Sequence, residues 1–251
     1  MGEKRLGLIG ATSLVGECLL PLIERKGMRV IAFSRSSGNP AKGGIEWRQL
    51  GDHPFTDTAP DEVEEVIDSW ICVAPIWVLP EHFHLLETHN VRRVVALSST
   101  SRFTKGKSSD PGEQELARRL AGGEDALRTW AEARGVEWII LRPTLIYGRG
   151  RDKNITEIMN FISRFGFFPM FGRAKGLRQP VHAEDVAQAC LAALEESAQI
   201  NHAYNLSGGE TLSYREMKTF AEFRFFFCPH LGHKFSIFSS GSRSFRPPLR
   251  P

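Results

Sequence analysis

The stretch that decides the fold is RLGLIGATSLVGECLLPLIERK, residues 5–26. It predicts a short apolar strand over 4–10, and then a helix over 14–26 whose apolar residues recur at the spacing of one helical face. The connecting turn runs from Gly10 to Gly16. Gly10 permits a tight turn, and Gly16 permits the helix to pack closely on the strand. The free N–H groups and partial positive charge at the start of such a helix favour an anion.

The rest of the chain alternates in the same way between apolar strands and amphipathic helices. Further strands are expected over 29–34, 44–50, 69–74, 92–98 and 136–141, and further helices over 61–68, 79–88, 113–134 and 183–196. This order predicts an α/β fold, a Rossmann-type doubly wound parallel sheet with helices on both faces. We expect a dinucleotide-binding domain over 1–147, a small and apparently truncated substrate-side region over 148–222, and a tail over 223–251.

The glycine turn is the expected pyrophosphate site. In the usual G-x-x-G-x-x-G spacing the middle glycine is Ser13 here, so the pattern is imperfect, but its position between the first strand and the first helix is the required one. The residues expected to hold the cofactor here are Gly10, Thr12, Ser13, Leu14, Val15 and Gly16.

The end of the second strand bears on the choice between NADP and NAD. NAD-binding domains place an acidic residue there for the ribose hydroxyls, whereas this chain has Arg35 between serines. A guanidinium can make a two-point contact with a 2′-phosphate, which favours NADP, with NAD as the alternative. Arg35 as a solvated loop residue remains open. Asp52, after the third strand, either accepts from the adenine amino group or caps a turn.

Composition excludes several classes of protein. The 251 residues are 41% hydrophobic and 24% charged, as in a soluble globular protein, and no apolar run approaches the roughly 20 residues that span a membrane. The four cysteines form no CxxC pair and no signal peptide is visible, so we expect a cytoplasmic protein with reduced thiols. His82, His84 and His89 lack the i, i+4 spacing of a zinc helix, and no metal site is expected.

The tail differs from the rest of the chain. Residues 223–251 hold five basic residues, no acidic ones and seven of the 17 phenylalanines, without a countable periodicity. A basic arm for nucleic acid or membrane is one interpretation. The interpretation we favour is a substituted end that lacks stable packing against the sheet, so neither nucleic acid nor membrane is an expected partner. The oligomeric state is left open.

Five motifs in order give the chain a family resemblance. They are GATSLVG at 10–16, ALSST at 96–100, LRPTLIYG at 141–148, VHAEDVAQA at 181–189 and YNLSGGETLSYREM at 204–217. The chain resembles the extended or atypical branch of the short-chain dehydrogenase/reductase superfamily, the NAD-dependent epimerase/dehydratase family, over about residues 1–220. The resemblance implies that Pro143 lines the nicotinamide side. Ala74, Pro75 and Ser98 come after their strands and are expected to contact the cofactor as well, since ligands bind at the carboxyl ends of such strands.

The resemblance also shows what is missing. Active members have a hydroxyl after the fifth strand, matched by Thr100, and a Tyr-x-x-x-Lys on the next helix, where the phenol acts as acid and base. Aligned through Glu124 and Leu127, those two positions are Leu116 and Leu120.

Two substitutes for the missing chemistry are weighed. Tyr147, after the sixth strand, is the candidate for a relocated acid beside Thr100, against the alternative that its ring packs a loop. Lys105 and Lys107 either bind an anionic substrate or lie on a solvated surface.

Three functions therefore stay open. The first is an NADP-dependent reductase or epimerase that acts on a small carbonyl or sugar-like substrate. The second is a non-catalytic module that holds or senses NADP. The third is an inactive, truncated family member. Nothing in the sequence identifies the substrate.

Overall fold

The computed structural model describes residues 5–35, 44–50, 66–152, 155–165, 176–197, 200–213, 216, 235–239 and 244–245. Its main sheet contains nine strands: β1 (Arg5–Ile9), β2 (Arg29–Ser34), β3 (Ile45–Gln49), β4 (Ser69–Cys72), β5 (Arg93–Leu97), β6 (Glu137–Pro143), β10 (His202–Gly208), β12 (Phe235–Ser239) and β13 (Ser244–Phe245). The strand order across the sheet is β13-β12-β10-β6-β5-β4-β1-β2-β3. From β3 to β10 all neighbouring strands are parallel, which confirms the predicted doubly wound sheet.

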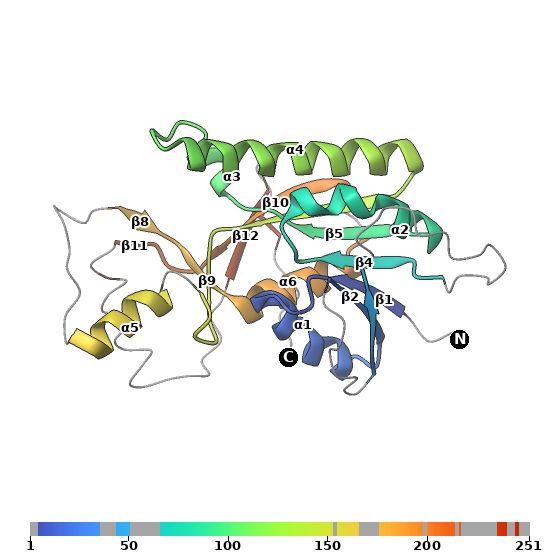
Figure 1. Cartoon of the computed structure of the whole chain (residues 1–251), viewed down its shortest axis with the longest axis horizontal. Coiled ribbons are helices and arrows are strands. Elements are labelled where there is room, and N and C mark those ends of the chain that lie inside the picture. The colour runs from blue at the N-terminus through green and yellow to red at the C-terminus, as the bar shows by residue number, and fades with distance from the viewer. Residues whose placement is uncertain are drawn as a thin grey trace.

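Helices cover both faces of this sheet (Figure 1). They are α1 (Leu14–Arg25), the 3-10 helix η1 (Ile76–His82), α2 (Phe83–Thr88), α3 (Ser101–Thr104), α4 (Pro111–Arg134), α5 (Ile155–Phe165) and α6 (Ala183–Glu195). Two small sheets complete the described structure, one pairing β7 (Leu145–Tyr147) with β9 (Pro180–His182), the other pairing β8 (Leu177–Arg178) with β11 (Leu212–Ser213). In Figure 1, α5, β8 and β11 lie to the side of the main sheet at which its parallel strands end.

The core has two apolar layers because successive strand residues face opposite sides. Leu6 and Leu8 of β1 belong to the layer under α1 and α6, whereas Ile9 belongs to the layer under η1, α2 and α4. Both layers are almost fully buried, as expected for a parallel sheet between helices. No helix within the described residues combines the length and apolarity that crossing a membrane requires.

Several predicted elements differ from the observed ones. The helix expected over 61–68 is wrong at residues 66–68, which have no regular structure, and residues 61–65 lie outside the described part. β4 ends at Cys72 rather than at residue 74, since Ala74 begins the turn into η1. The helix expected over 79–88 is divided at His82, where η1 ends and α2 begins; η1 contains Pro80, which lacks the N–H of a regular helical hydrogen bond.

The expectation that the tail lacks packing against the sheet is wrong for the described tail residues. β12 pairs antiparallel with β10, with Tyr204 opposite Ser239, and β13 pairs antiparallel with β12. The edge of β10 that does not face β6 offers a row of backbone donors and acceptors, and an extended segment satisfies them whatever its side-chain period. The absence of a countable apolar pattern was therefore poor evidence against a strand.

Candidate functional site

Gly10 and Gly16 make the close backbone contacts that were predicted for the turn between β1 and α1. Gly10 has φ +87°, a conformation that side chains rarely adopt, and a Cβ there would lie 2.6 Å from the Ala74 nitrogen. A Cβ on Gly16 would lie 2.4 Å from the Gly10 carbonyl oxygen. The turn is therefore compressed between the end of β4 and the first turn of α1, and a larger residue at either position would displace the backbone.

The start of α1 forms a cradle for an anion. Ser13 donates its backbone N–H to the Gly10 carbonyl at 2.9 Å and caps the helix, its hydroxyl accepting from the Gly16 N–H at 3.1 Å. Thr12 is exposed and Leu14 half-buried, whereas Val15 packs into the core. Ser13 has φ −73°, so this position needs no glycine for its own backbone. A side chain at Gly10 or Gly16 would overlap the backbone, so the turn keeps its tight path only with glycine at these positions. The free N–H groups at the start of α1, which follow this turn, fit a pyrophosphate.

Arg35, the residue expected to bear on the choice of dinucleotide, lies at the carboxyl end of the sheet. It follows β2 directly, is exposed, and forms no ion pair with any described residue. Its guanidinium is therefore available to a ligand at the carboxyl end of the sheet. Asp52, the other residue expected on the adenosine side, lies outside the described residues.

The remaining strand-end residues lie along the same edge. Pro75 is exposed and Ala74 half-buried directly after β4. The ladder between β5 and β6 continues beyond β5, since Ser98 N–H donates to the Leu141 carbonyl at 2.8 Å and Thr100 N–H to the Pro143 carbonyl at 3.1 Å. The Thr100 hydroxyl also lies 3.4 Å from the Pro143 oxygen. The structure thus brings Thr100 and Pro143 together.

The two positions at which the family motif has tyrosine and lysine are leucines in this chain, and both leucines have apolar surroundings. Leu120 belongs to the apolar layer under α4, and Leu116 packs against that layer. Neither side chain can give or take a proton. The general acid and base of ordinary family chemistry are absent from this helix.

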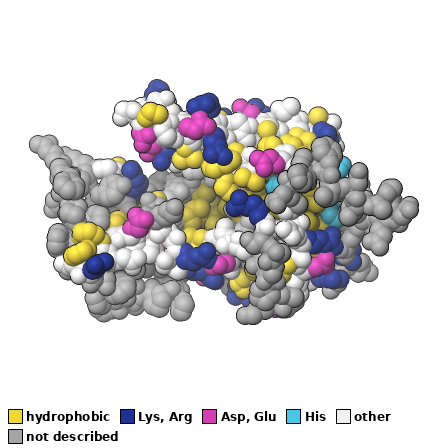
Figure 2. All heavy atoms as spheres, viewed as in Figure 1, with side chains coloured by type: hydrophobic (Ala, Val, Ile, Leu, Met, Phe, Trp, Pro, Cys, Tyr) yellow, Lys and Arg dark blue, Asp and Glu magenta, His cyan; other side chains and the backbone are white. Residues whose placement is uncertain are grey.

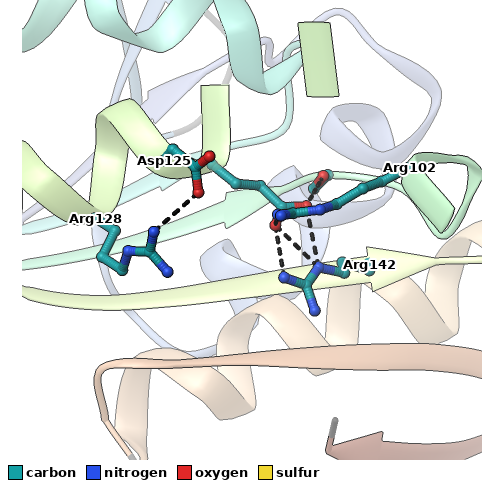
Figure 3. Close-up of polar contacts among 6 residues, drawn as sticks. Arg102, Asp125, Arg128 and Arg142 are labelled. Atoms are coloured by element: carbon teal, nitrogen blue, oxygen red, sulfur yellow. Dashed lines mark hydrogen bonds and ion pairs between the residues drawn. The ribbon is translucent and has the colours of Figure 1, made fainter. Parts of the chain in front are cut away.

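One turn further along α4 lies a buried polar cluster that sequence reasoning missed (Figure 3). Glu124 is only 2% exposed and accepts from Arg142 of β6, from Nη2 at 2.6 Å and from Nε at 3.0 and 3.1 Å. Arg102 of α3 donates to the same carboxylate. The Ser98 hydroxyl donates to Glu124 at 2.5 Å, so this side chain belongs to the cluster, and a contact of Ser98 with a cofactor stays a prediction.

The environment of Glu124 sets its charge. Burial alone would raise its pKa, but hydrogen bonds from Arg142 and Ser98 and the charges of Arg142 and Arg102 together hold the pKa below its usual range. Glu124 is therefore a carboxylate at neutral pH and cannot act as a general acid there. Glu124 served in the sequence only to align the helix with the family motif. Its partners come from α3 and β6, which lie next to it only in the folded chain.

Tyr147 is a buried residue, 5% exposed, in β7. It lies opposite His182 of β9, and the two rings meet edge to face with centroids 5.2 Å apart. His182 also caps α6, its Nδ1 lying 3.4 Å from the Glu184 N–H. The ring therefore does contribute to packing between β7 and β9, and His182 is the residue beside it that the sequence did not single out.

The loop after β7 contacts the start of α1. Arg151 forms an ion pair with Glu17, and Arg149 hydrogen-bonds the Cys18 thiol. Burial raises the pKa of that thiol, and the Arg149 charge only partly opposes the rise. This loop thus connects the segment that carries Tyr147 to the helix that begins at the glycine turn.

The histidines of η1 and α2 are not gathered around one point. His89 is buried, with its ring 5.8 Å from that of Trp70. His82 ends η1, and burial lowers its pKa. Across the described ranges, no group of three or more metal-ligating side chains lies together.

Comparison with known proteins gives a family match and distant relatives. The model of the NAD dependent epimerase/dehydratase family matches residues 82–207. The uncharacterized protein y4nG of Sinorhizobium fredii is 25% identical over 134 residues, 51% of this chain and 33% of its own length. A protein of Arabidopsis thaliana, the mitochondrial NADH dehydrogenase [ubiquinone] 1 alpha subcomplex subunit 9, is 28% identical over 113 residues, 45% of this chain and 27% of its own length. The chain thus spans about a third or less of these curated relatives.

Solved structures share the fold. An epimerase from Methanothermobacter thermautotrophicus superposes with a TM-score of 0.71 at 17% identity, covering 92% of this chain and 79% of the other. A dTDP-glucose 4,6-dehydratase from Bacillus anthracis, solved in complex with NAD, gives 0.65 at 13% identity, with 87% and 80% covered. At these identities the likeness shows the fold and not the substrate.

Proposed function

The chain belongs to the NAD dependent epimerase/dehydratase family, and from this premise we propose that it is an NADP-binding protein. The observation that carries the proposal is the turn at Gly10. Its φ of +87° and its approach to the Ala74 nitrogen exclude a side chain at this position, and α1 follows the turn with free N–H groups that can bind a phosphate. The structural relative from Bacillus anthracis holds NAD, which supports a dinucleotide of this type on the same fold.

The preference for NADP depends on Arg35. An exposed guanidinium without an ion pair in the described residues suits a 2′-phosphate, with which it forms charge-assisted hydrogen bonds. NAD, which has no phosphate at the 2′ position, cannot form these charge-assisted hydrogen bonds with Arg35. Any reaction of the protein is a reductase or epimerase reaction on a small carbonyl or sugar-like substrate, with Thr100 and Tyr147 as the candidate catalytic residues.

A second function is favoured by α4. With Leu116 and Leu120 in place of the acid and base, the protein holds or senses NADP without ordinary turnover. A relative whose name describes a subunit of NADH dehydrogenase is compatible with a dinucleotide-binding role inside a larger assembly.

Calorimetric titration with NADPH and NADH tests the proposal. We expect tighter binding of NADPH, and Arg35→Asp should narrow or reverse the preference. A matched control is Arg92→Asp, which makes the same charge change at an exposed arginine just before β5, at the opposite end of the strands. Equal or tighter binding of NADH by the unaltered chain would refute the assignment of Arg35. Failure to bind either dinucleotide would refute the proposed function.

A further inference from the structure

The cluster around Glu124 has more positive than negative charge. Arg102 and Arg142 both pair with the single carboxylate of Glu124, and no second carboxylate in the described residues pairs with either arginine. The side chains of Glu124 and Arg142 are 2% and 9% exposed. The cluster therefore has a formal charge of +1 where little water is present to solvate it. Uncompensated charge in such a place is unfavourable, and an anion bound beside it would reduce that cost.

Arg102 is the member of the cluster that a ligand can reach. Its side chain is 24% exposed, and it donates to Glu124 through Nη1 only. Its Nε and Nη2 donate to no described residue. A guanidinium has five N–H donors in one plane, so this outer edge matches the two oxygens of a carboxylate or a phosphate.

The position of Arg102 along the chain places it at the ligand edge of the sheet. α3, which contains it, begins directly after Thr100, the hydroxyl residue at the end of β5. The ring of Phe103 lies beside both arginines, 5.7 Å from the Arg102 guanidinium and 5.1 Å from that of Arg142, and its side chain is 55% exposed. Figure 2 shows hydrophobic side chains in the hollow between α4 and the part of the molecule that holds α5.

The other cations after Thr100 are less suited to this role. Lys105 already pairs with Glu113 of α4, with Nζ and Oε1 3.0 Å apart. Lys107 is exposed in the loop before α4 and belongs to no buried cluster. Arg102 differs from both in that a buried carboxylate orients it while the three N–H donors on Nε and Nη2 stay available.

We infer that Arg102 binds the anionic group of a small-molecule ligand, a carboxylate or a phosphate, beside Thr100. Glu124 and Arg142 position it, and the ligand supplies the negative charge that the cluster lacks. The inference deepens the proposed function and rests on it only in placing this ligand next to a bound dinucleotide.

The test is a titration of the full chain with pyruvate, with inorganic phosphate and with acetone, each in the absence and in the presence of NADPH. Calorimetry and the ligand-induced change in melting temperature are the readouts. We expect pyruvate or phosphate to bind and acetone not to bind, and the tighter of the two anions identifies the chemical source. Arg102→Gln should lower the affinity for the anion by about 10-fold or more, since hydrogen bonds to charged groups contribute about 1.5–3 kcal/mol.

Arg128→Gln is the matched control. Arg128 lies on α4 and, like Arg102, pairs with a carboxylate, in this case that of Asp125 at 3.0 Å (Figure 3). Its side chain, however, is 51% exposed. This variant should bind the anion as the unaltered chain does. Arg102→Lys, which keeps the charge but loses the planar fork, should bind with intermediate affinity and decides the matter if Arg102→Gln does not fold.

The two proposals fail separately. Equal anion affinity in the Arg102 and Arg128 variants, or no anion binding by the unaltered chain, would overturn the inference and leave NADPH binding untouched. Anion binding that depends on Arg102 in a chain that does not bind NADPH would support the inference and refute the proposed function.

Discussion

The glycine turn and α4 stand in contrast: the turn lies at the carboxyl edge of the sheet, whereas α4 packs across one of its faces. At the turn, Gly10 and Gly16 have tight backbone contacts that exclude side chains. On α4, Leu116 and Leu120 replace the groups on which proton transfer depends. The turn depends on residues without side chains, whereas the acid–base positions of α4 depend on the chemistry of the side chains that occupy them.

The contrast leads us to expect that dinucleotide binding and catalysis depend on separate parts of this fold. A pyrophosphate is recognised mostly by backbone N–H groups and a helix terminus, which persist while the turn keeps its glycines. Proton transfer needs particular side chains, and two substitutions remove it without disturbing the sheet. We therefore expect the two regions to respond to different mutations.

The largest expected effect concerns chemistry. Loss of general acid–base help lowers a rate by roughly 10²–10⁴-fold. With NADPH and a panel of ketones, aldehydes and nucleotide sugars, we expect turnover that is weak or absent, measured as oxidation of the nicotinamide. If Tyr147→Phe or Thr100→Ala abolishes a residual rate, the acid has been relocated. Robust turnover that neither substitution affects would show that the active site lies elsewhere.

The second effect concerns stability at α4. Glu124→Gln removes the counter-charge of the buried Arg142 and of the partly exposed Arg102, and removing one partner of a buried pair costs about 3–5 kcal/mol of unfolding free energy. The control is Asp125→Asn, one residue along the same helix, whose carboxylate is 52% exposed and whose loss should cost less than about 1 kcal/mol. Equal costs in urea unfolding would contradict a buried ionic role for Glu124.

The pH dependence of unfolding in acid tests the contribution of Glu124 to stability independently. The pKa of Glu124 is lower in the folded protein than in the unfolded chain, so its contribution to stability is complete above the unfolded value of about 4.3. That contribution is lost as the pH falls through the lower, folded pKa. The acid dependence of unfolding should therefore be weaker in Glu124→Gln than in the unaltered chain.

The smallest of the three effects concerns the turn. Gly10→Val should lower NADPH affinity by about 100-fold, or about 2.7 kcal/mol, because the side chain would collide with the Ala74 backbone and displace the turn that precedes the start of α1. Gly27→Val is the control, since Gly27 also has positive φ, +66°, but nothing lies within 4 Å of a Cβ placed there. A folded Gly10→Val protein with unchanged affinity would disprove the site.

Much of the fold and half of the site could be predicted from local pattern. The strand, turn and helix over residues 5–26 are formed by neighbouring residues. The spacing of their apolar residues and the two glycines therefore predicted these elements correctly. The missing tyrosine and lysine could be recognised by alignment alone. The placement of β12 beside β10 could not, because an extended segment can satisfy a sheet edge without an apolar period of its own.

Local sequence pattern was enough to predict a doubly wound α/β protein, a strand, glycine turn and helix over residues 5–26, Arg35 after the second strand and leucine at both acid–base positions of α4. The folded chain was needed to show that Ser98 donates to Glu124, that Arg102 and Arg142 share that carboxylate, and that the rings of Tyr147 and His182 are in contact. The reason is physical. Helical and strand periods are set by neighbouring residues, whereas the partners of a buried charge come from segments that meet only when the sheet has closed.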